Sequence, residues 1–492
     1  MNIKISKKDI NKVILDDFDV VIIPCFKKNP FIPNFLSNTK FKKINLQKLI
    51  SKSNFNGEKN EILHLINPIN YNVNIIFASC GNKVNSSTIE ETFNIGVRKA
   101  IKEKYERILI FSNYQKMNID NYESFIARGS IWGSYKFENF KTNNKLSISL
   151  VFAHEKTSAK KINNGIMQGN VFHRIADLAN SPANFATPSK IAKYANQLSK
   201  KNDIKVNIFN EKQLKEKKCE GILSVANGSI NEPRLIFIEK LGSSKKQPII
   251  IIGKTVTFDT GGISLKSSNA MEWMRYDKSG GMAVLALMEI LSNFNLNQSV
   301  IGILGAAENM PGGNATKPGD IIKSYNGKTI EILNTDAEGR LILADALGIA
   351  AELNPECIID IATLTGAVIS ALGNSAAGIL GNNNKLIKSL QISGNEVDEK
   401  LWELPIYDDF INDMKSDFAD LSNMSKSGTA GTATAAAFLS NFVNDEIPWA
   451  HIDIAGMAWK NKSNIFQESG ATLFGTRLLL EWLNKHKVIK NF

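Results

Sequence analysis

The chain of 492 residues is longer than one hydrophobic core usually organises, so we expect two domains of unequal size. Hydrophobic residues make up 43% of it, yet no run approaches the roughly 18 to 20 apolar residues of a membrane span. The start is polar and lacks a signal-peptide core, so we expect a cytoplasmic protein that engages no membrane.

The formal net charge of +11 raises the question of a nucleic-acid partner, because clustered lysines and arginines neutralise phosphates. The lysines are scattered among asparagines and isoleucines, without the repeated aromatic residues on which bases stack. We therefore interpret the charge mainly as a solvated face and expect no nucleic-acid partner. The 4 cysteines are far apart and form no CxxC pair, so we expect them reduced and mostly buried.

The first part of the chain predicts alternating strands and helices. Apolar runs of strand length and β-branched content lie at residues 20–24, 74–78, 108–111 and 148–152. Between the second and third run, residues 88–104 have helical periodicity, and Ser87 with Glu90 has the spacing of a capping box. The pattern predicts a small N-terminal α/β domain over residues 1–157.

A polar stretch at 154–164 suits a linker or the start of a connecting helix, and a larger domain over 158–492 follows it. Buried-strand candidates lie at 234–238, 248–252, 299–304 and 357–361, and helices are expected at 281–291 and 341–353. Near-continuous apolar strands that alternate with helices predict a mainly parallel sheet covered by helices on both faces. Both domains are therefore of the α/β class.

Ionisable residues concentrate in two segments that follow predicted strands, where ligands of such sheets collect. The first segment begins as a loop at 252–262 and continues to residue 277, and the second covers 334–340. Together they offer four acids and three basic residues: Asp259, Asp277, Asp336, Glu338, Lys254, Lys266 and Arg340.

The acids of these segments predict a metal centre. Asp336 and Glu338 are two apart, so both carboxylates project from one face if the segment is extended. Like charges this close need a positive partner, and a divalent ion supplies it; Asp259 and Asp277 can complete a second site. Nearby glycines at 261, 262 and 339 allow the backbone to turn tightly beneath the site. A lysine beside metal ions can lose its proton and bind, since positive charge and burial lower its pKa.

Other hydrolase and nucleotide motifs fail on spacing. The segment that ends in Gly253-Lys254-Thr255 has Pro248 where a phosphate-binding loop needs its first glycine, and no GxSxG nucleophile motif is present. The 5 histidines contain no HExxH pair, and we expect them to be structural. His451 is the exception for which we expect a supporting role at the site.

The heptapeptide Asn334-Thr-Asp-Ala-Glu-Gly-Arg340 resembles the signature of the leucyl aminopeptidase family, also called the cytosol aminopeptidases. The segment Gly253-Lys-Thr-Val-Thr-Phe-Asp-Thr-Gly-Gly262, with Lys266 and Met274-Arg-Tyr-Asp277, resembles the other metal loop of that family. Further similarity lies at 180–184, 308–313, 362–366 and 450–456, so the resemblance covers roughly residues 165–485. It implies a metalloaminopeptidase that removes the first residue, with Leu or Met preferred, from unblocked peptides.

The resemblance also implies a role for each matching position. The implied metal ligands are Lys254, Asp259, Asp277, Asp336 and Glu338, with Asp259 and Glu338 serving both ions. Lys266 and Arg340 would be catalytic, with Arg340 holding a bicarbonate-like anion. The implied substrate pocket consists of Met274, Asn334, Ala337, Thr363, Leu364 and Gly366.

By the same resemblance, a water that bridges two divalent ions would attack the peptide bond, and the chain would form a homohexamer. Oxygen ligands with one lysine suit Zn, Mn, Co or Mg, of which we favour Mn or Zn. Lys278-Ser279 and Ser425-Lys426-Ser427 depart from the common family pattern, which leaves fine specificity and subunit contacts open. A dipeptidase, for example one for cysteinylglycine, and a DNA-binding regulator that keeps the fold are the alternatives.

Overall fold

The computed structural model describes residues 2–27, 29–30, 46–68, 73–112, 119–142, 147–154 and 158–490. Contacts divide the chain into two compact units, Met1–Arg174 with Asn461–Ser469, and Ile175–Lys460 with Gly470–Phe492. The boundary expected at 157/158 lies just before helix α5 (Ala159–Asn180), whose last residues belong to the second unit. The polar stretch at 154–164 thus contains the start of a connecting helix, while residues 155–157 lie outside the described residues.

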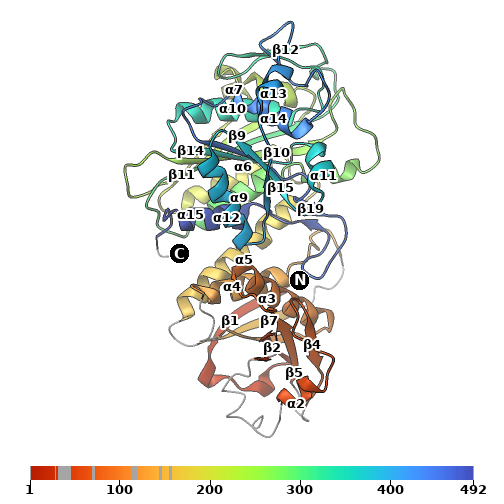
Figure 1. Cartoon of the computed structure of the whole chain (residues 1–492), viewed down its shortest axis with the longest axis vertical. Helices are drawn as coiled ribbons and strands as arrows, with labels where there is room; N and C mark the ends of the chain where they lie inside the picture. The colour runs from red at the N-terminus through yellow and green to blue at the C-terminus, as the bar shows by residue number, and fades with distance from the viewer. Residues whose placement is uncertain are drawn as a thin grey trace. The chain divides into compact units, whose positions relative to one another are not determined.

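The first unit is built on a sheet with strand order β1-β7-β6-β2-β5-β4 (Figure 1). The four expected strands are confirmed as β2 (Val20–Phe26), β5 (Asn74–Ser79), β6 (Arg107–Phe111) and β7 (Ser147–His154). The remaining strands are β1 (Asn2–Asp9), β3 (Asn29–Pro30) and β4 (Ile62–Leu65). The strands from β1 to β5 in this order run parallel, whereas β4 is antiparallel to β5 and β3 to β2.

Helices α3 (Ser86–Lys102) and α4 (Tyr122–Gly133) pack closely in this unit, which also contains the short helix α2 (Leu46–Ser51). The expected capping box on Ser87 is wrong, because Asn85 caps α3: its side chain accepts from the Thr88 amide at 2.8 Å. Glu90, the other expected member, is buried and pairs with Arg128 of α4 at 2.5 Å. The carboxylate therefore joins two helices instead of capping one.

The second unit contains a larger sheet with strand order β16-β15-β18-β14-β10-β11-β9-β8. Its strands are β8 (Ile204–Phe209), β9 (Arg234–Lys240), β10 (Ile249–Asp259), β11 (Val300–Asn309), β14 (Cys357–Ala362), β15 (Ala377–Gly381), β16 (Leu401–Glu403) and β18 (Trp449–Asp453). The central strands β18, β14, β10 and β11 run parallel, and the antiparallel pairings lie outside them. The expected α/β fold is confirmed.

Helices cover both faces of this sheet, with α10 (Gly339–Glu352) and α14 (Gly431–Ser440) above it and α9 (Ser279–Leu291) and α15 (Thr476–Lys485) below it in Figure 1. The upper helices share one apolar core with β10 and β14. The other helices are α6 (Pro188–Gln197), α7 (Glu211–Glu216), α8 (Glu220–Ala226), α11 (Gly366–Leu372), α12 (Asn384–Glu396) and α13 (Asp408–Asp413). The minor strands are β12 (Ile321–Lys323), β13 (Thr329–Glu331), β17 (Leu421–Ser422), β19 (Trp459–Lys460) and β20 (Gly470–Ala471).

Two further expectations concern membranes and thiols. Among the described residues, no helix is long and apolar enough to cross a membrane. All four cysteines are free and buried, as expected.

Candidate metal centre

The central strand β10 carries two of the candidate ligands, Lys254 and Asp259. The expectation that a loop begins near Ile252 is wrong, because the ladder with β11 continues to Asp259. Residues five apart on a regular strand face opposite sides, but the register shifts between Val256 and Asp259. This irregularity lets the Lys254 and Asp259 side chains reach the same carboxyl cluster at the end of the sheet.

A tight turn follows β10 and returns the chain toward the site. Gly261 (φ 86°) and Gly262 (φ 67°) adopt left-handed conformations, which explains the paired glycines at this point. The turn is closed by Thr335, whose hydroxyl donates to the Gly261 carbonyl at 2.6 Å. Lys266 lies beyond the turn, and Asp277 follows a 3₁₀ helix at Met271–Tyr276.

The second acidic segment is a turn and not the extended strand considered from the sequence. The Asp336 amide donates to the Asn334 side chain at 2.8 Å, and Glu338 has α-helical dihedrals just before α10. The turn nevertheless brings the two carboxylates together. Oxygens of Asp259, Asp336 and Glu338 all lie within 4.8 Å of one another.

Gly339 is needed for close packing and not for a turn, which corrects the role expected for it. It is the first residue of α10, and a Cβ atom there would lie 2.5 Å from Nζ of Lys254. Any larger residue would require the lysine side chain to shift.

Lys254 is buried at the centre of the cluster. Its Nζ lies 2.8 Å from a Glu338 oxygen and 3.0 Å from Asp277 Oδ1, and it donates to the Thr363 carbonyl at 2.8 Å. Burial lowers the pKa of the ammonium, but Asp277, Glu338 and Asp259 together raise it above its ordinary value. The lysine is therefore one of the positive charges that balance these carboxylates.

The aspartate carboxyl groups of the cluster have raised pKa values, which means that their environment disfavours uncompensated negative charge. Burial, followed by the repulsion of Glu338, raises the pKa of Asp259, and burial raises that of Asp277 well above its ordinary value. Burial and Asp259 likewise raise the pKa of Asp336. Bringing cations to this site would relieve both the desolvation and the mutual repulsion.

Asp277 has a further property expected of a metal ligand. Its Oδ1 accepts from the Thr363 hydroxyl at 2.6 Å and contacts Lys254, whereas its buried Oδ2 has no hydrogen-bond partner in the described part of the chain. An unsatisfied buried carboxylate oxygen is costly unless a ligand completes it. The donor set thus fits divalent ions.

Lys266 contacts the same acids from the open side of the cluster. Its ammonium lies 2.8 Å from Asp259 Oδ2 and also contacts Asp336, and its side chain retains 23% exposure compared with 3% for Lys254. Burial acts against its charge, but Asp259, Glu338 and Asp336 raise its pKa. The two lysines are therefore both charged, but only Lys266 is accessible.

Arg340 is buried in the first turn of α10, and its Nη1 donates to the Asn423 carbonyl at 2.7 Å. Burial lowers its pKa to about 10, while Glu338 and Asp453 act in the opposite direction. Its Nε is buried and has no hydrogen-bond acceptor within the described ranges. A small anion would supply that acceptor.

The sequence did not identify the polar residues that hold the ligand segments in place. Asn309, at the end of β11, donates to Asp259 Oδ1 at 2.8 Å and to the Thr335 carbonyl at 3.0 Å, and so joins both segments. Asn423 accepts from the Leu333 and Asn334 amides at 2.8 and 3.2 Å. Asn309 lies in a stretch that resembles the family, whereas nothing in the sequence distinguished Asn423.

The expected substrate residues lie on the segments that carry or adjoin the clustered acids. Thr363 and Leu364 follow β14, and Thr363 bonds directly to Asp277. Met274 and Asn334 lie in the segments that carry Asp277 and Asp336. Ala337 is half-buried between the two acids of the turn, and Gly366 is exposed at the start of α11.

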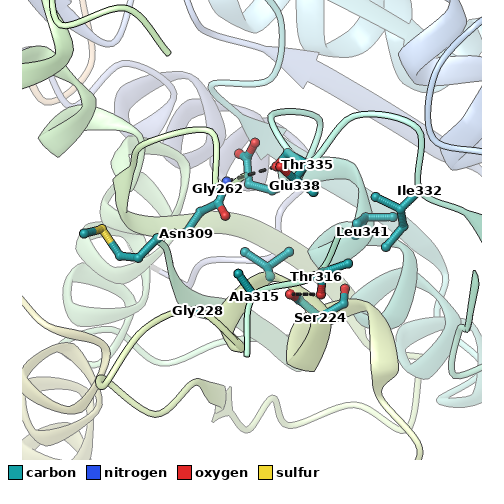
Figure 2. Close-up of a pocket in the computed structure, with 12 residues that line it drawn as sticks. Ser224, Gly228, Gly262, Asn309, Ala315, Thr316, Ile332, Thr335, Glu338 and Leu341 are labelled. Atoms are coloured by element: carbon teal, nitrogen blue, oxygen red, sulfur yellow. Dashed lines mark hydrogen bonds between the residues drawn. The ribbon is translucent and has the colours of Figure 1, made fainter. Parts of the chain in front are cut away.

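A small cavity behind Glu338 is lined by both ligand segments (Figure 2). Gly262, Asn309 and Thr335 approach it from one side and Leu341 from another. Its volume of about 10 Å³ is close to the room that one water needs, so it is too small for a substrate.

His451 occupies a buried position below the cluster. Its Nδ1 lies 2.5 Å from Asp360 Oδ1, and Asp360 also accepts from the Trp449 indole at 2.7 Å. Burial lowers the pKa of the imidazole, but Asp360 and Asp453 raise it above its ordinary value. Three other histidines have structural partners: His64 contacts the Tyr105 hydroxyl, and His173 and His486 contact backbone carbonyls.

The sequence matches both domains of one known protein family. The catalytic domain of the cytosol aminopeptidase family matches residues 173–480, and the N-terminal domain of the same family matches residues 22–144. A probable cytosol aminopeptidase of Rickettsia bellii (strain OSU 85-389) is 40% identical over 375 residues, 74% of each chain. One of Geobacter sulfurreducens (strain ATCC 51573 / DSM 12127 / PCA) is 43% identical over 369 residues, 73% of this chain and 74% of that protein.

Among solved structures, the bottromycin maturation enzyme BotP in complex with Mn superimposes with a TM-score of 0.83. The alignment covers 95% of this chain and 99% of that one at 24% identity. At this level of identity, the similarity shows a shared fold.

Proposed function

Because this chain belongs to the cytosol aminopeptidase family and is therefore a metallo-exopeptidase, we propose that it removes N-terminal residues from unblocked peptides at a two-metal centre. The observation that supports this most strongly is the convergence of Asp259, Asp336 and Glu338 within 4.8 Å, beside buried Lys254 and Asp277. Acids crowded around one point repel one another, and divalent ions would relieve that repulsion.

In this proposal Lys254, Asp259, Asp277, Asp336 and Glu338 hold two divalent ions, and the raised pKa values and the unpartnered Asp277 oxygen support the fit. When bound, such ions polarise the scissile carbonyl and lower the pKa of water to make a nucleophile. Lys254 must lose its proton in order to bind an ion, so metal binding should release protons.

Lys266 and Arg340 carry out the remaining steps. The Lys266 ammonium, which is held at the accessible side, donates to the oxyanion that develops on the substrate carbonyl. The buried Arg340 Nε would hold a bicarbonate-like anion, which would supply a base for the proton of the attacking water. No side chain of the cluster needs to act as a nucleophile.

Substrate choice follows from the groups around the cluster. Met274, Ala337 and Leu364 offer apolar contacts, with Asn334, Thr363 and Gly366 completing the pocket, so Leu or Met is preferred over Asp at the first position. The α-amine must be free and neutral to reach the ions.

The test of this proposal compares leucine amide with N-acetyl-leucine amide on the metal-loaded enzyme. Because acetylation removes the basic lone pair of the amine, we expect turnover of leucine amide and none of the acetylated compound. Methionine amide should be cleaved and aspartate amide poorly. Similar kcat/KM values for the free and acetylated leucine compounds would show that the amine is not bound as proposed.

Metal identity, assembly and location are also part of the proposal. The oxygen-rich set favours Mn or Zn, and BotP is described in complex with Mn. On the family resemblance we propose that the chain forms a homohexamer. We also propose that it works in the cytoplasm, because its relatives are named cytosol aminopeptidases.

A further inference from the structure

A buried carboxylate outside the proposed ligand set lies directly beneath the candidate site. Asp453 is the last residue of β18, is fully buried, and pairs in register with Ala362, the last residue of β14. It therefore stands where β14 passes into the 363–366 segment, which carries three of the expected substrate residues.

The Asp453 carboxylate fixes that segment through hydrogen bonds. Its Oδ1 accepts from the Leu364 amide at 3.1 Å, and its Oδ2 accepts from the Thr365 hydroxyl at 2.6 Å. The same hydroxyl accepts from the Val368 amide at 3.2 Å and so caps α11. A single carboxylate thus orients both the loop and the start of the helix after it.

We infer that Asp453 is a positioning residue of the peptidase site, which holds the 363–366 loop through the hydrogen bonds of its carboxylate. The inference rests on the proposed function for its catalytic consequence, but not for its effect on the loop.

Asp453→Asn and Asp453→Ala test this role. The asparagine oxygen can still accept from the Leu364 amide and its NH₂ can donate to Thr365, so this variant keeps both hydrogen bonds. Alanine loses both. Asp345→Asn is the matched control, because Asp345 is also fully buried and accepts backbone amides, from Ile222 and Tyr325 at 2.9 and 2.8 Å, away from the loop.

Hydrogen–deuterium exchange of residues 363–368 and steady-state kinetics with leucine amide should be measured on all variants, with metal content as a check. We expect faster exchange only in Asp453→Ala, since only alanine releases the Leu364 amide. Asp453→Ala should also lose about 10- to 100-fold in kcat/KM at wild-type metal content, as when a supporting group is removed. Asp453→Asn should keep wild-type exchange, metal content and kcat/KM. The Asp345→Asn control should match the wild type in both measurements.

Two results would overturn the inference: unchanged exchange of the loop in Asp453→Ala, or wild-type kcat/KM in that variant. If the wild type itself did not cleave leucine amide, the proposed function would fail. The exchange comparison would then still decide whether Asp453 holds the loop.

Discussion

Replacing Lys266 with alanine should lower kcat by about 10²- to 10³-fold while the enzyme keeps its metal. A charged donor aimed at a developing oxyanion acts mainly in the transition state, and losing one costs about 3 to 4 kcal/mol. In the metal-free protein this ammonium contacts Asp259 and Asp336, so its removal takes a competing cation away from two proposed ligands. Metal affinity should therefore be maintained or increased.

Steady-state kinetics and metal analysis by mass spectrometry check this expectation. The control is Lys317→Ala, which removes a lysine of the same domain that is paired with Asp320 at the surface. Its kcat and metal content should equal those of the wild type. A Lys266→Ala enzyme that lost metal together with activity would place Lys266 among the ligands and contradict its role as oxyanion donor.

Replacing Lys254 with methionine should lower both the stability of the metal-free protein and its affinity for metal ions. Lys254 is 3% exposed and is the cation between Glu338 and Asp277 in the metal-free protein. Removing one partner of such a buried cluster leaves unbalanced carboxylates and costs about 3 to 5 kcal/mol. We expect the free energy of unfolding of the metal-free variant to fall by that amount.

The same variant loses one proposed ligand, so its metal content at limiting concentration should drop below that of the wild type. Added Mn²⁺ should restore part of the stability, since cations replace the missing ammonium. Denaturant unfolding with and without Mn²⁺ measures both effects. A metal-free Lys254→Met protein as stable as the wild type would mean that the carboxylates are not balanced by this lysine.

Much of the fold could be predicted because apolar strand patterns are local. The runs at 74–78 and 357–361 match β5 and β14 closely, since buried parallel strands are apolar on both faces. The clustering of the acids could be predicted because their motifs are short and contiguous. The heptapeptide at 334–340 contains both acids and the arginine, whatever its backbone conformation.

Other features depend on which strands pair and which distant segments meet, and the sequence alone does not specify this. The polar half of β10 continues as a strand because β11 satisfies its backbone, so the end of the apolar run at Ile252 did not mark the end of the strand. Asn423 and Asp453 reach the site from segments far along the chain. Their roles follow from where β17 and β18 lie, which local propensity does not specify.

The proposal of a two-metal centre is tested most directly by titrating the chelated enzyme with Mn²⁺ while binding and hydrolysis of leucine amide are followed together. Five proposed ligands, three of them clustered carboxylates, predict that the metal-free enzyme is inactive. It should bind two ions per chain and gain activity as they bind. Calorimetry should also show proton release, because Lys254 is charged before metal arrives. Full hydrolysis by the thoroughly chelated enzyme, or saturation of activity at one ion per chain, would contradict the account.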